Sequence, residues 1–351
     1  MVTWFSARRY GPIGVDLGSR SVKLLQLSGD CTRVVEAARW DLPPANGAQA
    51  EGRVAEIVQA IRHAREGRRF RGREAVFALP SGELFVQNFR VAQATGPELD
   101  KIVSAEACGR LPFAGQEAEI RYLEAADVRQ GDVVRREVIV LACRRAVIET
   151  VLAVAEGTGL QPRAIDVPPA ALLRCYCRQF RRDEDQQMPM MLVNLGTLNT
   201  AVVISRGADA MFVKYVDVGG QQLDQAVARS LKMSLSDAAA LRRHNGDRRA
   251  DQRDPEVTRS IAEAIRPELE RLTGEISMCL RYYSVTFRGQ PLARVILGGG
   301  EANDGMAEWL GGHLDIPCEL GDPLRTYDKP GSTGRSTQWD VAAGLALREL
   351  N

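Results

Sequence analysis

Two stretches of the chain share one pattern of apolar and polar positions. Residues 13–27 form an apolar run, a turn that contains Gly and Ser, and a second apolar run, which is the pattern of a strand hairpin. Residues 191–204 repeat it, and each hairpin leads into a third apolar run, at 32–40 and 210–218. The repeat aligns Asp16 with Asn194, Gly18 with Gly196 and Ser19 with Thr197. The pattern therefore predicts two similar lobes, each with a small-residue turn at its tip.

The remainder of the first lobe alternates strands and helices. The segment 83–154 has the composition of a self-contained α+β insert within this lobe. The predicted helices lie at 46–64, 97–108, 145–156 and 168–180, and the predicted strands at 75–79, 84–91, 119–123, 137–142 and 164–167.

A charged segment without periodicity, residues 181–187, separates this lobe from the next. The second lobe is predicted to hold helices at 222–231, 236–244, 305–312 and 339–350, and a long helix that starts at about 256 or 261 and ends at 287. It is also predicted to hold a strand at 294–297 and a loose polar segment at 245–255. Alternating strands and helices with hairpins predict an α/β protein with mixed sheets. The expected domains are a first lobe at 11–187 and a second lobe at 188–351, whose outer part covers about 222–290.

Composition narrows the function classes. The chain of 351 residues carries 46 basic and 45 acidic residues, a formal net charge of +1, which argues against a nucleic-acid partner. No apolar run reaches the roughly 18 residues that span a bilayer, and residues 1–11 lack the apolar core of a secretion signal. The seven cysteines and three histidines are scattered without ligand spacing. We expect reduced thiols and no structural metal.

Small residues and donors gather where a phosphate chain could bind. Gly18 and Gly196 permit close approach of backbone amides, and Lys23 offers a point charge. Asp16 is the candidate for magnesium, held through water. A third turn, Gly298-Gly299-Gly300-Glu301, follows a predicted strand and would neighbour a nucleoside. Further donors from the two turns are Ser19, Ser21, Thr197, Asn199 and Thr200. Each turn is weak evidence alone, but three in this order predict a nucleotide cleft between the lobes.

These motifs resemble the actin-like ATPase superfamily and, within it, the PilM family of type IV pilus assembly proteins. The resemblance runs from about residue 11 to residue 350. Its motifs are GVDLG (14–18), SVKL (21–24), PEL (97–99), LPF (111–113), GTGLQP (157–162), IDV (165–167), EI (275–276), RYY (281–283) and LGGG (297–300).

The resemblance implies a two-lobed actin-like fold with four subdomains, the insert being the one shared with FtsA. It implies ATP and Mg²⁺ in the cleft, with Glu275 on the long helix as a weaker nucleoside neighbour. It also implies an adaptor that binds the cytoplasmic N-terminal peptide of a PilN-like inner-membrane protein and contacts other platform proteins. Such a protein would be cytoplasmic and recruited to the inner membrane through these partners. FtsA-like proteins carry a membrane helix after the last helix, and none follows here, which favours PilM.

One residue departs from the superfamily pattern. Asn194 stands where actin-like hydrolases place an acid, and a neutral amide is a poor base. One positioned acid is worth roughly 100- to 10,000-fold in rate. We therefore expect ATP binding with weak or absent hydrolysis. Asp217 precedes Gly219-Gly220 and indicates a turn at the lobe's edge rather than a replacement acid.

Several alternatives remain open at this stage. The chain could be an active ATPase or kinase of the same fold, or the cytoplasmic platform module of a type II secretion system, which normally continues into a membrane span. Arginines between Arg65 and Arg73 fit either a solvated connection, the more common case, or a contact with anionic lipid. Trp4 and Phe5 beside Arg8 and Arg9 fit either a disordered start or a short interfacial anchor.

Overall fold

The fold was obtained as a computed structural model that describes residues 10–43, 50–180, 185, 187–247, 252–287, 291–329, 331 and 334–350. The segment at Trp4 and Phe5, for which a disordered start or an interfacial anchor was considered, and most of the predicted linker at 181–187 lie outside these residues. The expected start of the first helix, at residues 46–49, lies outside them as well.

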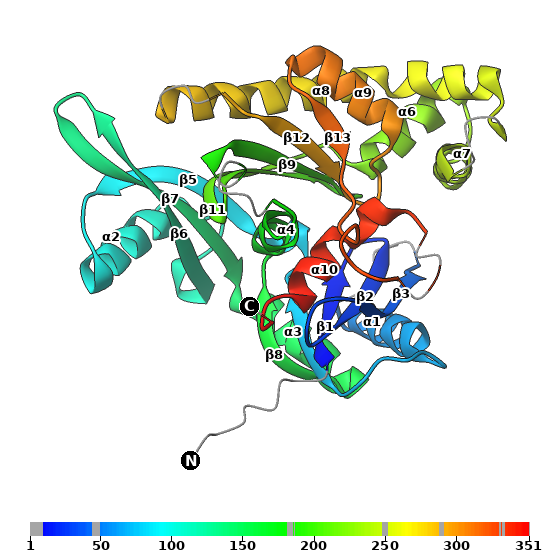
Figure 1. The fold of residues 1–351 in the computed structure, drawn as a ribbon, viewed down its shortest axis with the longest axis horizontal. Helices are drawn as coiled ribbons and strands as arrows, with labels where there is room; N and C mark the ends of the chain where they lie inside the picture. Colours follow the sequence, from blue (N-terminus) through cyan, green and yellow to red (C-terminus); the bar gives the residue numbers. More distant parts are fainter. Residues whose placement is uncertain are drawn as a thin grey trace.

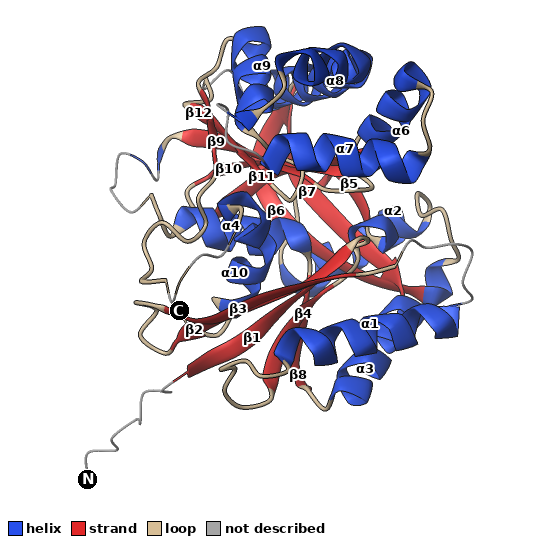
Figure 2. Ribbon diagram, turned by 90° about the vertical axis from the view of Figure 1, so that its right-hand side faces the viewer, coloured by secondary structure: helices blue, strands red, loops and turns tan. Residues whose placement is uncertain are grey.

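Each lobe is built on a five-stranded mixed sheet, and the two sheets have the same topology (Figures 1 and 2). The first, in the order β3-β2-β1-β4-β8, consists of β1 (Tyr10–Leu17), β2 (Ser21–Ser28), β3 (Val34–Asp41), β4 (Glu74–Ala78) and β8 (Gln161–Asp166). The second, in the order β11-β10-β9-β12-β13, consists of β9 (Pro189–Leu195), β10 (Thr200–Arg206), β11 (Asp209–Val216), β12 (Arg294–Gly298) and β13 (Cys318–Leu320). The predicted duplication is confirmed.

Strand pairing extends the duplication to single residues. Strand β1 pairs antiparallel with β2 and parallel with β4, and β9 does the same with β10 and β12. Asp16 lies opposite Lys23 across the first hairpin, and Asn194 lies opposite Ala201 across the second. The second hairpin therefore lacks both the acid and the cation of the first.

The insert is a three-stranded sheet covered by one helix, and it rests on the second lobe. It comprises β5 (Phe85–Ala92), α2 (Gly96–Cys108), β6 (Ala118–Gln130) and β7 (Val133–Arg144), with short 3₁₀ turns η1 (Ser81–Glu83) and η2 (Gly115–Glu117) at its borders. Asn88 of β5 donates from Nδ2 to the carbonyl of Val213 and accepts the Val213 N–H, at 2.7 and 3.2 Å. Buried Glu137 of β7 accepts bonds from Arg90 and Tyr282. The insert thus covers the outer edge, β11, of the second sheet.

Strands β6 and β7 of the insert are longer than the sequence predicted, at 119–123 and 137–142, whereas β5 has the predicted length. The β6–β7 hairpin projects beyond the body of the protein (Figure 1), and Val133 and Val134 at its end are exposed. Polar residues dominate this end on both faces, so no apolar alternation marks it as strand. Helix α3 (Arg145–Thr158), expected in the insert, packs beside α1 (Ala50–Arg65) under the first sheet instead.

Among the described residues of the second lobe, four helices pack around its sheet or extend from it. They are α6 (Gly220–Leu231), α7 (Leu235–Asp247), α8 (Pro255–Thr286) and α9 (Asp304–Leu314). Asp254 caps α8 by accepting the N–H groups of Glu256 and Val257, at 2.9 and 3.3 Å, which explains why this helix begins early. Helix α7 continues to Asp247, so the expected loose segment at 245–255 is helical at its start.

Two helices cross between the sheets, and one of them changes the expected lobe boundary. Helix α4 (Pro168–Cys177) lies beside α10 (Asp340–Ala346), which follows a 3₁₀ turn, η4 (Ser336–Trp339), and the two share one buried cluster (Figures 1 and 2). Helix α10 packs against β1, where a Cβ on Gly14 would lie 2.2 Å from the carbonyl oxygen of Ala342. The expectation that 339–350 closes the second lobe is therefore wrong, because this helix covers the first sheet.

Candidate functional site

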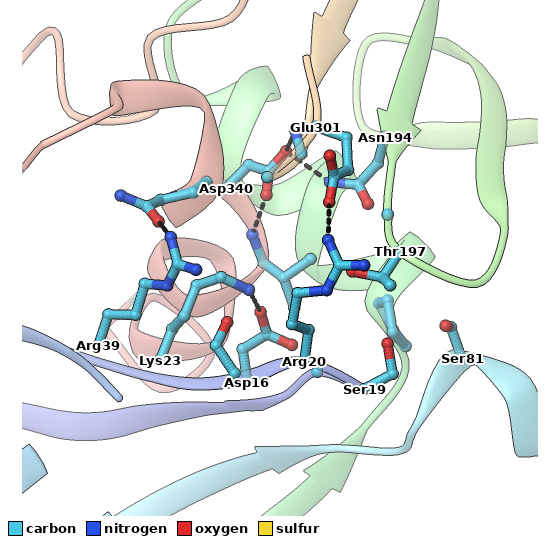
Figure 3. A pocket seen from close by; sticks show the side chains of 18 of the residues that line it. Asp16, Ser19, Arg20, Lys23, Arg39, Ser81, Asn194, Thr197, Glu301 and Asp340 are labelled. Atoms are coloured by element: carbon cyan, nitrogen blue, oxygen red, sulfur yellow. Dashed lines mark hydrogen bonds and ion pairs between the residues drawn. The ribbon is translucent and has the colours of Figure 1, made fainter. Parts of the chain in front are cut away.

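A pocket of about 810 Å³ opens between the lobes, and both duplicated turns line it (Figure 3). Most of the predicted site residues meet there although they come from both halves of the chain. The predicted residues in its wall are Asp16, Gly18, Ser19, Ser21, Lys23, Asn194, Gly196, Thr197, Gly299, Gly300 and Glu301.

The two turns have the same backbone geometry. A Cβ on Gly18 would lie 2.7 Å from the carbonyl oxygen of Ser21, and a Cβ on Gly196 would lie 2.9 Å from that of Asn199. These contacts are at equivalent positions of the repeat, and both are closer than a side chain allows. Glycine is therefore required in each turn by the fold itself, and its absence of side chain leaves backbone amides uncovered at the pocket.

An ion pair marks the first turn. The Lys23 ammonium lies 2.7 Å from Oδ2 of Asp16, and both side chains are 12 % exposed. Because they face each other across the β1–β2 hairpin, the sheet fixes their separation. A cation and an acid held side by side at a glycine turn can serve a phosphate oxygen and a hydrated metal ion, respectively.

A buried carboxylate, missed in the sequence, stands behind the second turn. Asp340 at the start of α10 accepts Nδ2–H of Asn194 at 2.7 Å and the N–H groups of Gly299 and Val341 at 3.0 and 2.8 Å (Figure 3). Burial raises its pKa to about 6, against the effect of these hydrogen bonds. Asp340 ties three segments together, and its donors occupy both of its oxygens. Only an apolar run preceded by Trp marks it in sequence, so no local motif could have identified it.

Two predicted donors of the second turn do not reach the pocket. The Thr200 hydroxyl is fully buried and donates to the carbonyl of Val218 at 2.6 Å. The Asn199 amide donates toward the carbonyl of Ser81 at 3.4 Å. The alternation of β10 turns Thr200 inward, so its hydroxyl stabilises the lobe rather than facing the cavity.

Two further predicted residues lie outside the pocket wall. Gly298 is backed by Asp340, whose Oδ2 would lie 2.3 Å from a Cβ there, so this glycine provides room for the carboxylate. Glu275 pairs with Lys214 at 2.7 Å, on the side of α8 that faces β11. The expectation that Glu275 neighbours the nucleoside is not supported by this placement, because its carboxylate is held at the sheet and not at the cleft.

Arginines supply most of the pocket's positive charge. Arg39 pairs with Asp41 at 2.7 Å and donates to Gln338 at 2.9 Å. Arg243 of α7 donates Nε–H to the carbonyl of Ala239, and burial lowers its pKa. Arg20 and Arg335 also line the wall. With Lys23 these make five cations against the acids Asp16, Asp41, Glu301 and Asp340, so the wall favours an anionic ligand.

A second cavity of about 280 Å³ adjoins the first, since Arg243 and Arg335 line both. Its other walls come from α7, α8 and the start of α9. Apolar side chains contribute, among them Ile261, Ile265, Met306 and the indole of Trp309. The combination suits a flat, partly apolar group attached to an anion.

No cluster of three His, Cys, Asp or Glu side chains that could hold a metal occurs within the described ranges. A cation at Asp16 would therefore need water or ligand oxygens to complete its shell, which is the manner of Mg²⁺. Among the described helices, none is both long and apolar enough to cross a bilayer.

Comparison with solved structures places the fold. A PilM-PilN type IV pilus biogenesis complex contains a chain that is 25 % identical, with a TM-score of 0.80, over 98 % of this chain and 99 % of that one. The ethanolamine utilization protein EutJ from Carboxydothermus hydrogenoformans matches with a TM-score of 0.57 at 17 % identity, over 96 % of this chain and 89 % of that one. MreB5 of Spiroplasma citri bound to ADP matches with 0.53 at 11 % identity, over 96 % and 95 %.

These likenesses confirm the predicted two-lobed actin-like fold. A family model described as type IV pilus assembly protein PilM matches residues 14–350. The chain belongs to the PilM family of type IV pilus assembly proteins.

Proposed function

We propose that the pocket binds Mg²⁺-ATP and that the protein is an ATP-liganded adaptor of the type IV pilus assembly platform. The observation that carries the proposal is the convergence of both duplicated glycine turns on one cationic pocket of about 810 Å³. When bound, the nucleotide supplies a negatively charged chain that both turns can contact at once.

The chain's own residues fit this ligand. Backbone amides of the Gly18 and Gly196 turns and the hydroxyls of Ser19 and Thr197 offer donors to phosphate oxygens. The Lys23 ammonium adds a charge, and Asp16 accepts hydrogen bonds from water on magnesium. The adjoining cavity with its arginines and apolar wall would hold the nucleoside.

Hydrolysis is expected to be slow or absent. Asn194 brings no charge to the second turn, and its amide nitrogen is committed to Asp340. Asp340 is buried, and Asn194 and Gly299 donate to its Oδ2 while Val341 donates to its Oδ1. We expect a carboxylate held by these three donors, and a neutral amide beside it, to be poor acceptors for the proton of an attacking water.

The partner follows from family membership. The similar PilM chain is described in a complex with PilN. We therefore propose that this chain binds the cytoplasmic N-terminal peptide of a PilN-like inner-membrane protein, together with other platform proteins, at the cytoplasmic face of the inner membrane. Membrane contact would be indirect. Within the arginine segment, Arg68 and Arg69 lie 3.9 and 3.7 Å from Glu36, and Arg65 donates to the carbonyl of Thr158, so these three already have partners in the lobe.

Calorimetry with Mg²⁺-ATP tests the nucleotide site. We expect a saturable heat of binding with no further heat flow after saturation. Lys23→Met should weaken the affinity for Mg²⁺-ATP about 10- to 100-fold, because hydrogen bonds to charged groups contribute about 1.5–3 kcal/mol. Glu275→Gln is the matched control and should bind as the parent does. Sustained heat flow after saturation would instead indicate an active ATPase, and absence of binding would contradict a role for nucleotide.

A synthetic peptide of a PilN-like protein's cytoplasmic N-terminus tests the adaptor role separately. Saturable binding to the Mg²⁺-ATP-loaded protein is expected, and a scrambled peptide of the same composition should not bind. Failure of the authentic peptide to bind would contradict the proposed partner whatever the nucleotide result.

A further inference from the structure

A closed ring of four charged side chains joins the two lobes beside the pocket. Arg20 extends from the β1–β2 turn of the first lobe to two acids of the second. Its Nη2 lies 2.7 Å from Oδ2 of Asp224 on α6, and its Nη1 lies 3.1 Å from Oε1 of Glu301 after β12. Arg242 of α7 closes the ring at 2.7 Å from Oδ1 of Asp224 and 2.7 Å from Oε2 of Glu301. Each carboxylate therefore has a guanidinium on each of its oxygens.

The second-lobe members of the ring are removed from water. Their side chains are 1 % exposed for Asp224, 5 % for Glu301 and 7 % for Arg242, whereas Arg20 is 23 % exposed. Burial alone would raise the pKa of Glu301, but attraction to Arg242, Arg20 and Arg243 outweighs it, so the pKa is lowered and the acid stays ionised. Without Arg20, two buried carboxylates would share one guanidinium and leave a net negative charge in a dry site.

The backbone makes room for this arrangement. Gly220, the first residue of α6, faces Glu301 so closely that a Cβ there would lie 2.4 Å from the carboxyl carbon. The sequence indicated a turn at Gly219-Gly220. In the structure, the second of these glycines also lets the carboxylate reach a position between both arginines.

We propose that this ring is a latch that holds the two lobes in the closed orientation before any nucleotide binds. The inference rests on the proposed function and concerns the regulation of its site. If Arg20 left the ring to bind a phosphate, the buried Asp224 and Glu301 would each lose one of their two guanidinium partners. Arg20 therefore stays in the ring, and the exposed part of its side chain lines the pocket. Because the lobes are already closed in the nucleotide-free protein, little of the nucleotide's binding energy is needed to close them. The relative orientation of the lobes, and with it the surface presented to a partner, is then the same with and without nucleotide.

Hydrogen exchange of the nucleotide-free protein tests the latch. Arg20→Ala should speed amide exchange in the turn at 18–21 and at the start of α6, 219–223, about tenfold, the factor given by ~1.4 kcal/mol of opening free energy. Small-angle scattering should show a larger radius of gyration. Arg39→Ala is the matched control, since it removes a cation from the same pocket but pairs with Asp41 and with no acid of the ring.

Added Mg²⁺-ATP should restore slow exchange in Arg20→Ala and change the parent little. If Arg20→Ala does not fold, Arg20→Lys takes its place, because one ammonium keeps the charge but cannot engage both carboxylates as the guanidinium fork does. Parent-like exchange and scattering in the folded Arg20 variant, without nucleotide, would overturn the latch. This readout needs neither nucleotide nor partner, so a protein that binds no ATP would refute the proposed function and leave the latch standing.

Discussion

Gly344 sets the distance between the crossing helices α4 and α10, and a single methyl group there tests the packing. A Cβ on Gly344 would lie 1.8 Å from the carbonyl oxygen of Ala171, whereas real Cβ atoms essentially never approach within 3.0 Å. The obstacle is helix backbone, so the helices must separate by more than an ångström. Such overpacking costs about 3 kcal/mol, while Ala gains about 1 kcal/mol over Gly in a helix. We expect Gly344→Ala to lower the free energy of unfolding by about 2 kcal/mol.

Gly274 provides the matched control, because it lies in helix α8 and a Cβ there would meet nothing within 4 Å. Gly274→Ala should therefore gain the helix propensity alone and stabilise by about 0.5–1 kcal/mol. Urea unfolding followed by circular dichroism gives both values, and thermal melting should place Gly344→Ala about 2–4 °C below the parent. If Gly344→Ala proves as stable as Gly274→Ala, the close packing of α4 on α10 is refuted.

Two further predictions concern buried charge. Arg242→Met should destabilise by about 3 kcal/mol in urea unfolding, because it leaves the buried Asp224 and Glu301 short of a counter-charge. Arg39→Met serves as the control, because Arg39 pairs with the exposed Asp41, and equal losses in the two variants would contradict the reasoning. Burial raises the pKa of Asp340 from its usual 3.8 to about 6, so between these pH values the folded protein keeps a proton that the unfolded chain releases. Its contribution to stability therefore falls by about 2 to 3 kcal/mol as pH rises through that window, and Asp340→Asn should lose this dependence; a constant stability difference between parent and variant from pH 4 to 7 would speak against it.

The sequence predicted the parts of the site that are local. A glycine turn, its neighbouring hydroxyls, Asp16 and Lys23 all lie within one hairpin, so apolar runs and small residues were sufficient to single them out as candidates; that Asp16 and Lys23 pair with each other was not predicted. The duplication strengthened this prediction because two hairpins of one kind were expected to face each other.

Residues whose role depends on distant partners could not be found in the same way. Asp340 meets Asn194 across 146 positions, and Arg20 meets Glu301 across 281. Thr200 was placed in the pocket on its residue type, but the strand turned it inward. Glu275 was assigned to the pocket through the family resemblance, but its side of α8 faces the second sheet, where it accepts a hydrogen bond from Lys214. Sequence proximity determines turns, whereas the direction of a side chain depends on the assembled sheet.

The packing of α10 on β1 has a consequence for how the chain is made. The strands of the first sheet leave the ribosome long before residues 340–346, which cover one of its faces. Until that helix arrives, the apolar surface around Gly14 has no permanent cover and is open to chaperones or to aggregation. The first lobe is synthesised first, but its sheet is completed only when the last helix of the chain has been made. We therefore expect the two lobes to reach their native state together, with no stable folding intermediate in which the first lobe alone is native.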